Sequence, residues 1–80
     1  MNAAATTHLG DPLTIFSSDS FCKSCKCWVT VYVTSPERPS KKAGFQFICT
    51  CNRIVDAAEG NFVEMPRVPL GAISAKLLPA

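Results

Sequence analysis

Phe21-Cys-Lys-Ser-Cys-Lys-Cys-Trp28 is the stretch on which the fold depends, together with Cys49-Thr-Cys51 further along the chain. These two clusters contain all five cysteines of the 80-residue chain, and the segment between them contains none. Paired thiols at both ends of one segment are what a single metal ion needs to close a loop. A domain this short buries a modest fraction of its surface, so we expect it to need such a staple.

The composition predicts one small folded domain in a reducing compartment. Hydrophobic residues make up 48% of the chain and charged residues 18%, which is not a disordered composition. No segment approaches the ~20 apolar residues of a transmembrane helix, and residues 1–11 lack the features of a signal peptide. We therefore expect a cytoplasmic or virion location without membrane attachment, where cysteine clusters bind metal more often than they form disulfides.

Alternating β-branched and aromatic residues make residues 28–34 the clearest strand in the sequence. A turn follows at residues 35–44, which contain two prolines and a glycine, and residues 45–51 are the returning strand. Residues 61–65 are predicted to add a third strand, and residues 72–78 one or two helical turns. The sequence thus predicts a small all-β fold around a three-stranded antiparallel sheet.

The register of this predicted hairpin follows from its apolar residues. If Thr34 lies opposite Gly44, every inward-facing valine meets an apolar residue of the other strand. These pairs are Val33 with Phe45, Val31 with Phe47, and Val29 with Cys49. The same register places Cys27 opposite Cys51 on the buried face, at the end of the hairpin that also carries Cys22 and Cys25.

Spacing selects four of the five cysteines as metal ligands. Cys22 and Cys25 are separated by two residues, the common spacing of a zinc knuckle. In an ideal strand the Cα atoms of Cys49 and Cys51 would lie about 6.6–6.8 Å apart, so both side chains reach one ion only if the strand bends or ends there. We predict one structural Zn²⁺ per chain, with Cys27 as the alternative ligand. Two disulfides with a free thiol, buried thiols, or an iron–sulfur cluster on the same ligands remain open.

This arrangement resembles a zinc ribbon: a knuckle, a β-hairpin, a second cysteine pair and a third strand, over roughly residues 21–65. The chain differs from the ribbon pattern in two places. Its first knuckle lacks the usual proline and glycine, and its second pair is C-x-C instead of C-x-x-C. The resemblance implies a zinc-stapled, zinc-ribbon-like sheet.

Nothing in the sequence predicts an enzyme. The chain has no glycine-rich phosphate loop, nucleophile elbow or pair of catalytic carboxylates, and its single histidine, His8, is expected to be a solvated tail residue. A partner or nucleic-acid face is predicted where aromatic residues adjoin a basic loop. Its members are Trp28, Tyr32, Arg38, Lys41 and Lys42. A small-molecule substrate is not expected.

The two ends of the chain complete the predicted organisation. Residues 1–20 and 66–80 have few charges and are expected to be extended arms that fray unless a partner orders them. We therefore expect a non-enzymatic structural or assembly protein that binds neighbouring protein subunits through its arms, of the kind found as virion cement or minor capsid proteins. The alternative is a zinc-ribbon module that binds nucleic acid or regulates transcription.

Overall fold

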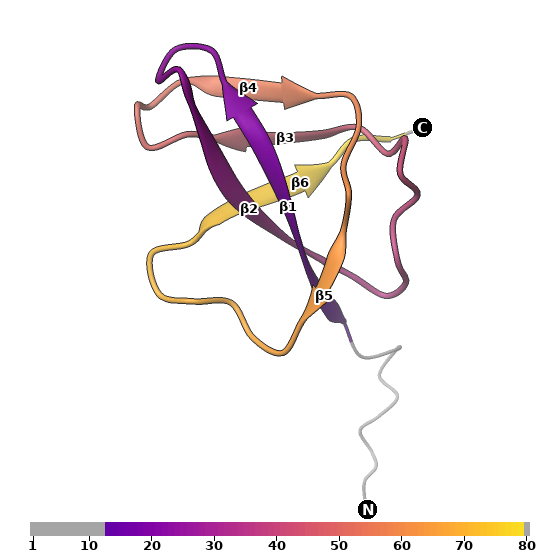
Figure 1. The fold of residues 1–80 in the computed structure, drawn as a ribbon. Coiled ribbons are helices and arrows are strands. Elements are labelled where there is room, and N and C mark those ends of the chain that lie inside the picture. The colour runs from indigo at the N-terminus through magenta and orange to yellow at the C-terminus, as the bar shows by residue number, and fades with distance from the viewer. Residues whose placement is uncertain (1–12, 80) are drawn as a thin grey trace, which may run out of the picture.

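The computed structural model describes residues 13–79 and folds them into six β-strands (Figure 1). The strands are β1 (Thr14–Cys22), β2 (Cys27–Ser35), β3 (Phe45–Ile48), β4 (Ile54–Ala57), β5 (Val63–Met65) and β6 (Ile73–Leu77). His8 lies outside the described residues. In residues 13–79 no helix is long and apolar enough to cross a membrane. The expected small all-β fold is confirmed.

The strands form one mixed sheet in the order β4-β3-β6-β2-β1-β5. β1 and β2 form a long antiparallel hairpin that runs from the pair Thr14 and Ser35 to the pair Cys22 and Cys27. β3 and β4 form a second, shorter antiparallel hairpin. β6 lies between the two hairpins, parallel to β2 and antiparallel to β3. Figure 1 shows the two hairpins crossing each other, with their loops near one another.

The predicted pairing of residues 28–34 with residues 45–51 is wrong. β2 pairs with β1 and β6, and β3 pairs with β4 and β6. The connection between β2 and β3 spans residues 36–44, which is long enough for β6 to lie between these two strands. A six-stranded mixed sheet therefore replaces the three-stranded antiparallel sheet that the sequence predicted.

The parts of the predicted arms that the structure describes belong to the sheet. Residues 14–20 form most of β1, whereas the sequence indicated a short strand at residues 13–16 and a loop at the serines of residues 17–20. Residues 73–77 form β6 in place of the expected helical turns, because the edges of β2 and β3 satisfy the backbone there. Residues 61–65 give only the short strand β5, which covers the first half of β1.

The core lies on the face that the strand alternation predicts. The buried apolar residues are Phe16, Cys22, Val31, Val33, Phe45, Phe47, Cys49 and Phe62. They come from both hairpins and from the segment between β4 and β5, so the curled sheet encloses one core. The inward orientation expected for the valines of β2 and the phenylalanines of β3 is therefore confirmed, even though their strands are not neighbours.

Candidate metal centre

The first cysteine loop is the turn of the β1–β2 hairpin. β1 ends at Cys22, β2 begins at Cys27, and the N–H of Lys26 donates to the carbonyl of Cys22 at 2.7 Å. Lys26 adopts a φ of 57°, in the left-handed region, so the chain turns directly after Cys25. The backbone N–H of Cys25 also donates to the Sγ of Cys22, with 3.4 Å between nitrogen and sulfur.

The second loop meets the condition that the C-x-C spacing imposes. β3 ends at Ile48, and the chain turns through Cys49 with a hydrogen bond of 2.8 Å from the N–H of Asn52 to the carbonyl of Cys49. Asn52 has a φ of 67°, directly after Cys51, as Lys26 does after Cys25. Both loops therefore place a left-handed residue after their second cysteine. Asparagine tolerates this conformation better than lysine does.

The two loops bring four thiols together. The Sγ atoms of Cys22, Cys25, Cys49 and Cys51 all lie within 4.8 Å of one another. The sulfur pairs Cys22–Cys51 and Cys25–Cys49 lie 3.8 Å and 3.4 Å apart. A tetrahedral ion with metal–sulfur bonds of about 2.3 Å needs sulfur atoms roughly 3.8 Å apart. All five cysteines are free of disulfides, so four of them, close together, could hold a metal ion.

Hydrogen bonds already make these thiols unequal. The backbone N–H of Cys51 stabilises the thiolate of Cys49 and lowers its pKa to about 6, against the opposing effect of burial. Cys25 holds its proton more tightly, because its hydrogen bonds to the sulfurs of Cys51 and Cys49 raise its pKa well above the usual range. A bound cation would replace these shared protons with sulfur–metal bonds.

Cys27 does not join the cluster. It lies directly opposite Cys22 in the β1–β2 register, but its side chain is exposed and its sulfur is not among the four that converge. The predicted position of Cys27, opposite Cys51 on the buried face, is therefore wrong. The pairing of β1 with β2 is the physical reason, since it gives Cys27 a different partner at the hairpin end.

The residues of the predicted partner or nucleic-acid face are spread along the molecule. Trp28 is at the start of β2, beside the cysteines, whereas Lys41 and Lys42 are in the loop beyond the other end. Seven residues of strand, or about 23 Å, separate Trp28 from Ser35. Tyr32 lies between the two ends and is half-buried.

Arg38 is exposed, but its guanidinium also contacts the core. Its guanidinium donates to the carbonyl of Phe62 at 2.6 Å and lies 5.4 Å from the centre of the Phe16 ring. These contacts tie the loop after β2 to the core. The guanidinium of Arg38 is thus engaged in contacts within the chain.

Two exposed apolar pairs flank the cysteine loops, and of their four residues only Trp28 was predicted to belong to a partner face. Phe21 and Trp28 lie opposite each other at the end of the β1–β2 hairpin, with their ring centres 5.5 Å apart. Ile48 and Ile54 lie opposite each other at the end of the β3–β4 hairpin. The available signal was the position of a large apolar residue at both borders of each cysteine loop.

Comparison of the chain with protein-family models, curated proteins and solved structures found no match.

Proposed function

We propose that the four-cysteine cluster binds one structural Zn²⁺ and that the chain is a non-enzymatic module for protein assembly. The convergence of four sulfur atoms at near-tetrahedral separations supports the proposal of a metal site. Zn²⁺ favours four thiolates in this geometry, and a site closed in this way leaves no position for a substrate. Iron accepts the same ligands, so the identity of the metal is part of the test.

The ion would stabilise the fold at the place where it needs a cross-link. The β1–β2 and β3–β4 hairpins share no direct strand pairing, because β6 lies between them. Coordination by two cysteines from each hairpin would join their loops and restrain both. Because structural zinc contributes its binding energy to folding, removal of the ion should loosen both hairpins.

The assembly role rests on the apolar surface around the cluster. Trp28 is 71% exposed, Ile54 66%, Ile48 60% and Phe21 42%. Large apolar side chains grouped beside one site are typical of a surface that another protein covers. Partner subunits therefore remain the preferred partner class, with the hairpin ends in place of the extended arms as the contact.

Nucleic acid is less well supported as the partner. Arg38 is held by Phe62 and Phe16, and the two lysines of its loop lie far from Trp28 along β2. Stacking surfaces need aromatic rings and cations side by side, which Trp28 and the two loop lysines of the predicted face do not provide. The two isoleucines also offer no ring on which a base could stack.

Native complexes provide the test. In extracts of the cells that make it, the chain should elute in a complex well above its own 8.6 kDa and keep that size after nuclease treatment. A double variant with Trp28→Ser and Ile48→Ser should elute as a monomer while it retains its metal. Lys41→Ser with Lys42→Ser is the matched control and should keep the complex. A monomeric native chain, or a complex that nuclease disperses, would contradict the assembly role.

A further inference from the structure

An open groove runs along the outer edge of β4. Its volume is about 440 Å³, and its walls are the consecutive residues Arg53 to Asp56 on one side and Phe21 to Ser24 on the other. Within the described residues β4 pairs with β3 alone, and no residue of β3 lines the groove. The groove therefore lies on the unpaired side of β4, between this strand and the end of β1.

The backbone of β4 presents hydrogen-bonding groups to this groove. The N–H of Cys49 donates to the carbonyl of Arg53 at 2.9 Å, which makes these residues a hydrogen-bonded pair at the hairpin end. Hydrogen-bonded pairs alternate along an antiparallel ladder, so Val55 also directs its N–H and C=O toward β3. Ile54 and Asp56 direct theirs the other way, toward the groove. Such an unpaired edge is a template for one further strand.

The opposite wall is also an incomplete edge. β5 covers β1 only at residues 15–17, so the end of β1 that carries Phe21 and Cys22 has no neighbour on that side among the described residues. An extended segment in the groove would therefore lie between two unpaired strand ends. It would also cover part of the metal centre, because Cys22 belongs to both.

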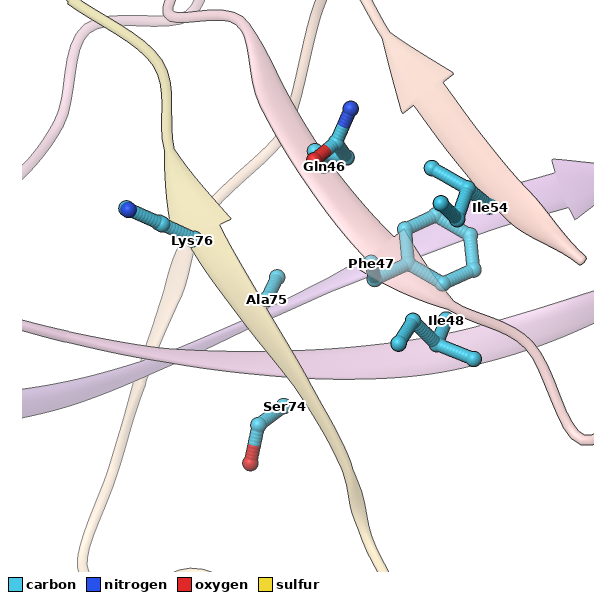
Figure 2. Close-up of a pocket in the computed structure, with 7 residues that line it drawn as sticks. All are labelled: Gln46, Phe47, Ile48, Ile54, Ser74, Ala75 and Lys76. Atoms are coloured by element: carbon cyan, nitrogen blue, oxygen red, sulfur yellow. The ribbon is translucent and has the colours of Figure 1, made fainter. Parts of the chain in front are cut away.

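The charges and apolar side chains that line the groove indicate the chemistry of the segment that would bind there. Lys23 and Arg53 line it, and Asp56 is the one acidic residue among the described residues that do so. The rim is apolar, with Phe21 on one side and Ile54 on the other. Figure 2 shows Ile54 with Ile48 beside it, at the adjacent hollow over β3 and β6, so the apolar rim continues beyond the groove.

We propose that this groove binds an extended acidic segment of a protein partner, which adds to the free edge of β4 as a strand. Backbone hydrogen bonds to Ile54 and Asp56 would supply affinity, and alternating acidic and apolar side chains would supply specificity. The proposal rests on the assembly role and names the chemistry of its partner. A second copy of this chain fits less well, since pairing two β4 edges would bring two sets of Lys23 and Arg53 together.

The test uses the full metal-loaded chain and a capped peptide of alternating glutamate and valine, six residues long. Amide chemical shifts are followed while the peptide is added to about 5 mM, which covers weak complexes. The result expected is a saturable shift centred on residues 53–56. A lysine–valine peptide of the same length should bind several-fold more weakly. No saturable shift, equal binding of the lysine peptide, or shifts centred elsewhere would overturn the proposal.

A matched pair of variants isolates the strand edge. Asp56→Pro removes the N–H that faces the groove and leaves the hydrogen bonds of β4 to β3 in place. Asp56→Ala keeps that N–H, and both variants lose the same 2.7 Å hydrogen bond from Gln46 to the Asp56 carboxylate. Proline should weaken peptide binding at least about fivefold, the effect of one net hydrogen bond, whereas alanine should not weaken it.

Equal peptide binding by the proline and alanine variants, or a monomer–dimer equilibrium of the free chain that proline abolishes, would overturn strand addition by a partner segment. The metal content and the size of the native complex report separately on the proposed function. If the chain forms the native complex but does not bind the peptide, the assembly role stands and only the proposal of strand addition in the groove is wrong. Metal content measured on both variants shows that each is folded.

Discussion

Replacing Gly60 with alanine forces a methyl group into the contact between two core phenylalanines. A Cβ atom at Gly60 would lie 2.7 Å from ring carbons of Phe62 and 2.9 Å from Phe45. The two rings are themselves packed edge to face with centres 5.6 Å apart, and both are buried. The backbone there is also fixed by a 3.0 Å hydrogen bond from the N–H of Gly60 to the carbonyl of Lys41. The rings must therefore move.

The size of the effect follows from two opposing contributions. Overpacking of a well-packed core costs about 1–3 kcal/mol. The lower entropy of the unfolded alanine chain returns about 0.4–1 kcal/mol. At the midpoints of these ranges the net loss is about 1.3 kcal/mol, to be compared with the 4–12 kcal/mol that is typical, roughly, for a domain of this length. For such a small domain this corresponds to a fall in Tm of about 5–10 °C.

Gly44→Ala is the matched control, because its Cβ would meet Ala57 and Leu78 at 3.6 Å, an ordinary contact. The control should be neutral or slightly more stable than the wild type. Both variants are compared by urea unfolding and thermal melting of the metal-loaded chain, with equal metal content verified first. If Gly60→Ala is as stable as Gly44→Ala, the packing of Phe62 over Phe45 described above is wrong.

Three further outcomes are expected. Lys26→Gly should stabilise the chain to urea by about 1 kcal/mol, because glycine adopts the left-handed conformation without the steric penalty of lysine; an unchanged midpoint would argue against that backbone geometry. Arg38→Gln should destabilise it by about 1 kcal/mol through loss of the contacts to Phe62 and Phe16, whereas Lys42→Gln should have no effect. Zinc affinity, measured by competition with a chromophoric chelator, should fall about tenfold or more for each unit that the pH is lowered from 8 to 6. The reason is that thiols must lose protons to bind the ion and that the pKa of Cys25 is raised. A pH-independent affinity would exclude thiolate ligation.

The cysteine cluster was the most predictable part of this molecule. A two-residue spacing at Cys22 and Cys25 required a turn, and the spacing of Cys49 and Cys51 required the strand to bend or end there. Both requirements are local, and the structure meets them with β3 ending at Ile48 and a left-handed residue at Asn52. The inward-facing residues of β2 and β3 could be predicted equally well, because the alternation of side chains along a strand does not depend on which strands lie next to it.

Strand neighbours were not predictable in the same way. The segment Ala72 to Leu78 contains alanine, lysine and leucine, which favour a helix, yet it becomes β6 because two strand edges are available to it. The serines of β1 suggested a loop, but Ser18 and Ser20 are buried on the inward face, and the Oγ of Ser18 accepts a hydrogen bond from the N–H of Asn61. Both segments depend on long-range contacts that local propensity does not encode.

Metal analysis of the purified full chain tests the central claim most directly. One zinc ion per chain is expected in the wild type and in Cys27→Ser, because Cys27 lies outside the cluster. Cys22→Ser should lose the ion, because it removes one of the four converging sulfurs. Iron in place of zinc, a metal-free wild type, or a zinc content that Cys27→Ser abolishes and Cys22→Ser preserves would contradict the account.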